Sequence, residues 1–205
     1  MLTAFTAGLI LITISELGDK TFFIAVILSM RHPRHLVLAG VVAALAAMTL
    51  LSVAMGQLIA FLPKIYTHYA AVALFLIFGI KLIYQASRMS SSSTEEIVDE
   101  AKEAIEVSEK NLKGRNNSLA ILLESFILTF LAEWGDRTQI ATVTLAAANN
   151  VVGVTLGAIL GHTICALVAV LGGSLIAGRV SERAVTMTGG VLFLIFGVVA
   201  ILEGA

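Results

Sequence analysis

Two short charged stretches, SELGDKTFF at residues 15–23 and AEWGDRTQI at residues 132–140, decide how the rest of the chain is interpreted. Each lies inside a long apolar run, and each carries the pattern Glu-x-Gly-Asp-(Lys/Arg)-Thr. Equivalent residues of the two copies are 117 positions apart, and the same offset relates Gly40 to Gly157 farther along the chain. The sequence therefore predicts a duplication, with one copy of the motif in each half.

The composition is typical of a membrane protein. Hydrophobic residues make up 58% of the chain and charged residues 13%, whereas about 25% of the residues of a soluble domain are charged. The mean hydropathy is +0.96. The net charge of −1 gives no basic field that would attract a nucleic acid. The single cysteine, Cys165, excludes an intramolecular disulfide.

Six apolar segments are each long enough to cross a bilayer, which takes roughly 20 residues. They cover about residues 4–30, 36–62, 68–87, 118–147, 151–178 and 184–203. The predicted fold class is an all-α integral membrane protein with six transmembrane helices. Because each half contributes three spans, an odd number, the second half must enter the membrane from the opposite face. This makes two inverted three-helix repeats, the plan of many secondary transporters.

The predicted domain organisation is a first repeat at residues 1–88, a linker at 89–117 and a second repeat at 118–205. The linker contains seven acidic and four basic residues within positions 95–115. Ile97, Ala101 and Ile105 recur at helical spacing in it, which predicts an amphipathic helix. We interpret this helix as a solvated connector, with an acidic regulatory or cation-attracting arm as the alternative.

Basic residues in the loops predict the orientation, because Lys and Arg accumulate on the cytoplasmic side of a membrane. Arg31 and Arg34 follow the first span, Arg179 and Arg183 follow the fifth, and the linker carries four further basic residues. All of these segments lie on the same side of the predicted topology. We therefore expect a cytoplasmic linker and both chain termini on the opposite side.

The charged residues of both motifs fall near the middle of their predicted spans. A charge at that depth costs about 2.5–3.5 kcal/mol, which is tolerable when it faces another charge, water or a bound ion. The spacing of Glu16 and Asp19 predicts that they share a helix face, and Glu133 and Asp136 have the same spacing. Each glutamate also has the i, i+4 spacing of an ion pair with the basic residue of its own motif.

If the two motif helices cross, the four carboxylates and the two basic residues sum to a charge of −2. One divalent cation or two protons neutralise that charge, and crowded carboxylates in a low dielectric bind protons readily. These properties favour a cation/proton exchanger, and oxygen ligands suit Mn²⁺, Ca²⁺ or Mg²⁺. The supporting residues predicted around the carboxylates are Gly18, Lys20, Thr21, Gly135, Arg137, Thr138 and Gln139.

The residues alone leave other interpretations open. The site is alternatively that of a proton-coupled exporter of a small organic ion, or of an intramembrane aspartyl hydrolase that uses Asp19 and Asp136. The hydrolase is disfavoured because each aspartate adjoins a cation that keeps it ionised, whereas such a dyad shares a proton. His162, inside the fifth span, is interpreted either as a proton relay or as a packing residue. Glu124 is interpreted as an interfacial carboxylate, with a place in the ion pathway as the alternative.

The motifs ELGDKT at 16–21 and EWGDRT at 133–138 resemble the paired signatures of the Gdt-type cation/proton exchangers. The resemblance covers nearly the whole chain, including both halves and the acidic linker. It implies an exporter of Mn²⁺, with Ca²⁺ as a second substrate, that exchanges the metal for protons and is not an enzyme. The acidic ligands that it implies are Glu16, Asp19, Glu133 and Asp136.

One residue departs from the symmetry of the two motifs. Phe22 stands where the second copy has Gln139, so we expect polar support for the site mainly from the second half. The chain is most similar to the cyanobacterial manganese exporters of the family, which implies a bacterial plasma membrane or a thylakoid membrane. The implied partners are divalent cations, protons and the lipid bilayer, with no prosthetic group and no nucleic acid, and a homo-oligomer is compatible with this interpretation.

Overall fold

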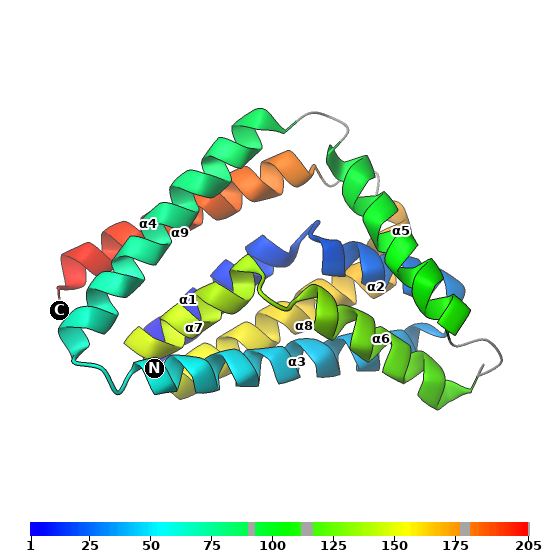
Figure 1. Ribbon diagram of the computed structural model, residues 1–205, viewed down its shortest axis with the longest axis horizontal. Coiled ribbons are helices and arrows are strands. Elements are labelled where there is room, and N and C mark those ends of the chain that lie inside the picture. Colours follow the sequence, from blue (N-terminus) through cyan, green and yellow to red (C-terminus); the bar gives the residue numbers. More distant parts are fainter. Residues whose placement is uncertain (90–92, 112–116, 177–180, 205) are drawn as a thin grey trace.

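A computed structural model describes residues 1–89, 93–111, 117–176 and 181–204, and every regular element within them is an α-helix (Figure 1). The helices are α1 (Leu2–Glu16), α2 (Lys20–Arg31), α3 (Arg34–Ile59), α4 (Lys64–Arg88), α5 (Ser93–Asn111), α6 (Ser118–Ala132), α7 (Arg137–Ala148), α8 (Val151–Ile176) and α9 (Glu182–Glu203). The predicted class, an all-helical membrane protein, agrees with this architecture. The predictions made on linker residues 90–92 and 112–116 and on Arg179 lie outside the described residues.

Four helices of the described chain are long and apolar enough to cross a membrane: α3, α4, α8 over Val151–Gly172 and α9 over Arg183–Leu202. The pair α6 and α7 passes the same test as one bent unit, with 74° between the two helices, which raises the number to five. The shorter helix α1 is also apolar. The predicted segments 4–30 and 118–147 are therefore not continuous helices, since each consists of two helices that meet at the charged motif.

The chain breaks its helices at the motif because both motif glycines have a left-handed backbone. The φ angle is +75° at Gly18 and +83° at Gly135, a region in which other residues are strained. The aspartate that follows each glycine has an extended backbone and occupies the N-cap of the next helix. The predicted sharing of one helix face by Glu16 and Asp19 is therefore wrong, because the helix ends between them.

The helices of the two halves correspond in order, and the first three of each half also correspond in length, whereas α4 has 25 residues and α9 has 22. Helices α1 and α6 have 15 residues each, α2 and α7 have 12, and α3 and α8 have 26. The offset of the two motifs, 117 positions, also relates both ends of α3 to those of α8. The sequence similarity of the motifs thus extends to the layout of the helices.

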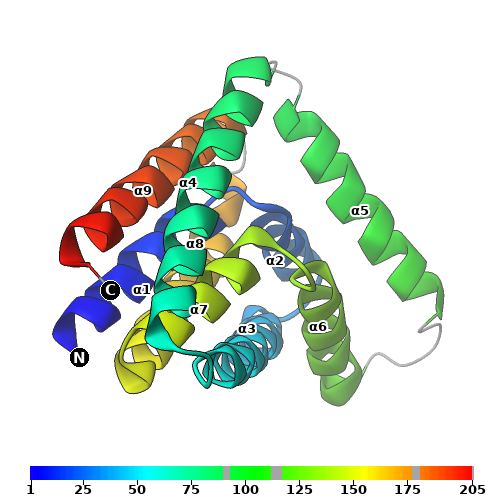
Figure 2. The same ribbon diagram turned by 60° about the vertical axis from the view of Figure 1, so that its left-hand side comes forward.

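The two halves interleave. Helix α1 packs along α8 and α6 packs along α3, while α4 and α9 run beside each other in opposite directions (Figures 1 and 2). Glycines on α8 permit the close approach of α1, because a Cβ added at Gly157 would collide with the backbone oxygen of Phe5. Since α1 and α6 each end at a motif, the interleaving brings the two motifs to the middle of the molecule.

The linker helix α5 packs across α2 instead of standing free in solvent. Ala101 and Ile105 are fully buried and belong to the same hydrophobic cluster as Phe22 and Phe23 of α2. The predicted amphipathic helix is present: part of its apolar side packs on the membrane helices and its acidic side, which includes Glu100, is exposed, so its interpretation as a connector stays a prediction. Both termini lie on the side of the molecule away from α5 (Figure 1).

Candidate cation site

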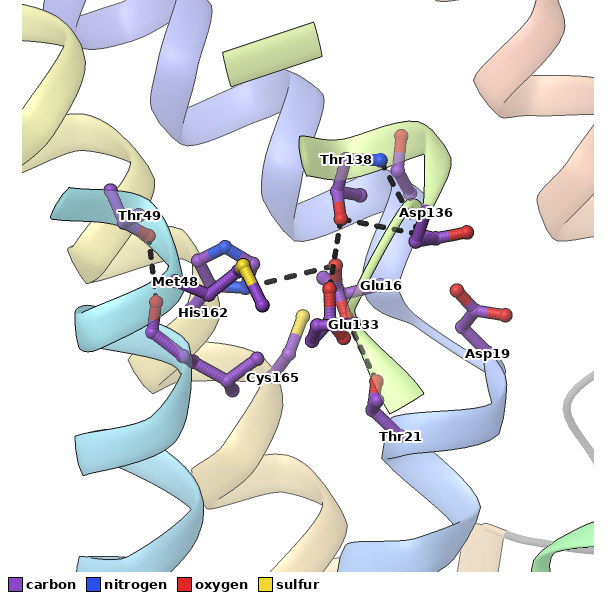
Figure 3. A network of polar contacts seen from close by, with 12 residues as sticks. Glu16, Asp19, Thr21, Met48, Thr49, Glu133, Asp136, Thr138, His162 and Cys165 are labelled. Atoms are coloured by element: carbon purple, nitrogen blue, oxygen red, sulfur yellow. Dashed lines mark hydrogen bonds and ion pairs between the residues drawn. The ribbon is translucent and has the colours of Figure 1, made fainter. Parts of the chain in front are cut away.

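Three carboxylates meet where the broken helices cross. Glu16, the last residue of α1, is 2% exposed, and Glu133, at the C-cap of α6, is 1% exposed. Each of these glutamates and Asp136 offers a ligand atom, and the three atoms lie within 4.8 Å of one another (Figure 3). Buried carboxylates this close together require a compensating positive charge. The arrangement is therefore a candidate site for a cation.

Each glutamate is oriented by the threonine of its own motif. Thr21 Oγ1 donates a hydrogen bond to Glu16 Oε2 over 3.1 Å, and Thr138 Oγ1 donates to Glu133 Oε2 over the same distance. The second oxygen of each glutamate, Oε1, is buried and has no hydrogen-bond partner among the described residues. Buried oxygens are rarely left without a partner. A cation bound between the two glutamates would engage both oxygens.

The two aspartates have different environments. Asp136 Oδ2 accepts a hydrogen bond from the backbone N–H of Thr138 at 3.3 Å, so it caps α7, and it lies 3.2 Å from the Thr138 hydroxyl, for whose single proton it competes with Glu133. Asp19 Oδ2 instead lies 3.4 Å from Arg137 Nη2, which also donates to the carbonyl oxygen of Ser15. The sequence predicted that all four acids meet, whereas the structure brings three together and places Asp19 beside an arginine of the other motif.

Lys20 is directed away from the carboxylates. Its ammonium lies 3.2 Å from Glu100 Oε2 on α5, and the two side chains are 40% and 63% exposed. The predicted ion pair between Glu16 and Lys20 is thus wrong, and the sum of −2 over six charges does not describe the buried group. Glu100 could not have been identified from the sequence, because no spacing relates the linker to the first motif.

Gln139 supports the turn of the second motif. Its Oε1 accepts a hydrogen bond from the backbone N–H of Gly135 over 2.7 Å, and its Nε2 lies 3.1 Å from Met48 Sδ on α3. Phe22, the corresponding residue of the first motif, lies in the apolar core. The polar side chain at this position therefore links the turn of the second half to α3.

Two further residues named from the sequence are buried. His162, on α8, points its Nδ1 at Glu16 Oε1 over 3.7 Å. Glu124, on α6, is 6% exposed, and its Oε2 lies 3.9 Å from His32 Nε2. Glu124 does not belong to the group of three, and its interpretation as an interfacial carboxylate stays a prediction.

The two glutamates are closed off from solvent, whereas Asp136 is partly exposed. The cavity beside Glu16 holds about 10 Å³ and is lined by apolar side chains that include Phe22, Val41 and Leu45. A larger cavity of about 500 Å³ lies between the α3–α4 and α7–α8 connections. It shares Thr67 with a cavity of about 200 Å³ that reaches Gln139. Neither of these two cavities is lined by Glu16, Glu133 or Asp136.

Replacement of Gly135 provides a test of the left-handed turn. No atom of the described residues lies within 4 Å of a Cβ built there, so Gly135→Ala has to overcome only its φ of +83°, at a cost of about 1–2 kcal/mol. Asn adopts this backbone more readily than Ala, and Val less readily. We expect metal affinity to fall in the order Gly, Asn, Ala, Val, as measured by isothermal titration. An equal loss for Asn and Val would contradict the role of the turn.

A helical membrane protein that gathers buried carboxylates at breaks in its helices has the construction of a secondary cation transporter. The model of the family described as divalent cation/proton antiporter GDT1 matches residues 4–90 and 121–205. The chain belongs to this family. It is therefore a transporter and not an enzyme, and the hydrolase interpretation is wrong.

Relatives from several organisms match nearly the full chain. A GDT1-like protein of the cyanobacterium Synechocystis is 62% identical over 200 residues, which are 98% of this chain and 97% of the relative. GDT1-like protein 3 of Oryza sativa subsp. indica is 45% identical over 95% of this chain and 72% of its own length. The chloroplastic PAM71-homolog of Arabidopsis thaliana is 44% identical over 95% of this chain and 58% of its own length. No solved structure matches the chain significantly.

Proposed function

We propose that the chain exports Mn²⁺, with Ca²⁺ as a second substrate, from the cytoplasm in exchange for protons. The observation that carries the proposal is the group formed by the buried Glu16 and Glu133 and the half-buried Asp136, whose ligand atoms lie within 4.8 Å of one another. Carboxylate oxygens are the ligands that these cations prefer. Asp19 is the fourth acid of the proposed site, and Arg137 holds it at the edge of the group in this structure.

The carboxylates and not the helix dipoles give the site its preference for a cation. Helices α1 and α6 end at the site and α2 and α7 begin there, so the partial charges of the helix ends oppose one another. A site assembled from helix ends and unwound backbone is typical of secondary transporters. Replacement of one divalent cation by two protons leaves the charge of this buried site unchanged, so the exchange avoids a bare cluster of charge inside the membrane.

The mechanism proposed for the exchange is alternating access around the two broken helices. In it, α1 with α2 and α6 with α7 each form one discontinuous span, which makes six spans in two inverted repeats at residues 1–88 and 118–205. The equal lengths of the first three helices of each half, and the offset of 117 positions that relates α2 to α7 and α3 to α8, support this topology. Because both glutamates are at most 2% exposed, an ion reaches them only after the helices rearrange. The structure is thus that of a closed state.

The proposed orientation places the linker in the cytoplasm and both termini on the other side of a plasma or thylakoid membrane. The position of α5 on the side away from the termini supports it. Export of a small organic ion, the other interpretation of the sequence, has no support from the family or from a group of three carboxylates. No oligomer is required by the site, because all of its residues come from one chain.

Transport by the purified protein in liposomes tests the proposal. An outward proton gradient is expected to drive Mn²⁺ into the vesicles, with about two protons released per ion, and the flux is expected to stop when a protonophore dissipates the gradient. Liposomes without protein provide the blank, and Ca²⁺, Mg²⁺ and a small organic cation are compared under the same gradient. Mn²⁺ flux that is indifferent to the proton gradient would overturn the exchange mechanism.

A further inference from the structure

The ring nitrogen Nδ1 of His162 is buried beside the carboxylate group without a hydrogen-bond partner among the described residues. The residue is 5% exposed, and this nitrogen lies 3.7 Å from Glu16 Oε1, which is too long for a hydrogen bond. Glu16 Oε1 also has no hydrogen-bond partner. Both atoms have lost their contact with water without gaining a hydrogen bond, which costs free energy. An ion bound between them would offset that cost.

A single cation accounts for the distance between the two atoms. Metal–ligand distances of about 2.0–2.6 Å place two ligand atoms of one ion roughly 3–5 Å apart. The 3.7 Å between His162 and Glu16 falls in this range. The three carboxylate ligand atoms lie within 4.8 Å of one another without His162, so the imidazole would reach an ion at Glu16 from outside that group. A neutral imidazole nitrogen carries the lone pair that a metal ion requires.

The packing of α8 against α1 holds His162 in place. Gly161, the preceding residue, lies so close to α1 that an added Cβ would be 3.1 Å from the carbonyl oxygen of Leu9. One turn after Gly161, Cys165 Sγ donates to the carbonyl oxygen of Thr13. His162 lies on the opposite side of the two glutamates from Asp19 (Figure 3). The imidazole therefore approaches the carboxylates from a direction that the acidic residues leave open.

We propose that Nδ1 of His162 is a ligand of the transported ion and that it selects Mn²⁺ over Ca²⁺ and Mg²⁺. This inference rests on the proposed function, because it adds a nitrogen to the site formed by Glu16, Glu133 and Asp136. All three ions prefer carboxylate oxygens, but Ca²⁺ and Mg²⁺ take oxygen ligands almost exclusively, whereas Mn²⁺ is the one transition metal among them and also accepts an imidazole nitrogen. Removal of the nitrogen should therefore weaken Mn²⁺ binding and affect Ca²⁺ little.

Pulsed electron paramagnetic resonance of bound Mn²⁺ tests the ligand directly. The wild-type protein loaded with Mn²⁺ is expected to show coupling to a directly bound ¹⁴N nucleus, replaced by ¹⁵N coupling when the histidines are ¹⁵N-labelled. His162→Gln is expected to lose the coupling. The chain has four histidines, and the matched control His68→Gln, at a residue that lines the remote 500 Å³ cavity, is expected to keep it.

Competition binding measures the selectivity. His162→Gln replaces the nitrogen by an amide oxygen, and we expect the preference for Mn²⁺ over Ca²⁺ to fall by about tenfold or more, equivalent to about 1.4 kcal/mol. Ca²⁺ binding that is retained by the variant shows that it is folded. If His162→Gln does not fold, the spectra of the labelled wild type decide the matter.

Different results would overturn the role of His162 as a ligand and the proposed cation site itself. Wild-type protein that binds Mn²⁺ without ¹⁴N coupling, or His162→Gln with unchanged selectivity, overturns the role of His162 and leaves the carboxylate site intact. Wild-type protein that binds neither Mn²⁺ nor Ca²⁺ overturns the proposed site as well.

Discussion

Glu133→Gln is expected to abolish proton-driven Mn²⁺ flux and to lower the affinity for Mn²⁺ by at least about 100-fold, or about 2.7 kcal/mol. The amide keeps the shape of the side chain and still accepts the hydrogen bond of Thr138. It removes one negative charge from a position that is 1% exposed, where water cannot replace it. Flux into proteoliposomes and isothermal titration with Mn²⁺ measure the two effects.

The matched control is Glu124→Gln, which removes a buried carboxylate from the same helix but outside the group of three. We expect it to bind Mn²⁺ within about twofold of the wild type, a difference of about 0.4 kcal/mol. Asp19→Asn and Asp136→Asn are expected to abolish flux in the same assay. Full transport by both aspartate variants, or by Glu133→Gln, would show that the buried acids serve only the packing of the helices.

Gly157→Ala is expected to destabilise the fold more than any other glycine-to-alanine change on the described part of α8 or α9. The new Cβ would overlap the carbonyl oxygen of Phe5 and lie 3.0 Å from the amide nitrogen of Leu9. Both are backbone atoms, which cannot rotate away, so α1 has to move off α8. Overpacking of this kind costs about 1–3 kcal/mol, and we expect the melting temperature in detergent to fall by roughly 5–10 °C.

Gly189→Ala provides the control, because the nearest atom of the described residues to its Cβ is Ser15 Oγ at 3.8 Å. This variant should melt at or above the wild-type temperature. Gly40→Ala, the counterpart of Gly157→Ala in the other half, brings a Cβ within 2.5 Å of the carbonyl oxygen of Leu122 and should behave like Gly157→Ala. Equal melting temperatures for all three variants would contradict the close packing of the two interleaved pairs.

The sequence alone predicted the class of protein and the acids at its centre. Scarce charges in an apolar chain are tolerated only where they face one another, and the two copies of one motif identified Glu16 and Glu133 as facing residues. The supporting role of Gln139 in the second half was also predicted, because the first copy of the motif has Phe22 at that position. The proximity of the two glutamates could be predicted because it depends on composition and residue type and not on the path of the backbone, whereas their role as cation ligands stays a prediction.

The tertiary structure alone decided the partners of the charged residues. The i, i+4 spacing assumes a continuous helix, but Gly18 and Gly135 turn the backbone, so the basic residues point elsewhere. Arg137 pairs with Asp19 of the other half, and Lys20 pairs with α5. His162 meets Glu16 only because α8 lies against α1. These contacts join residues 80 to 146 positions apart, so they depend on which helices pack together. The spacing of residues within one helix does not give that information.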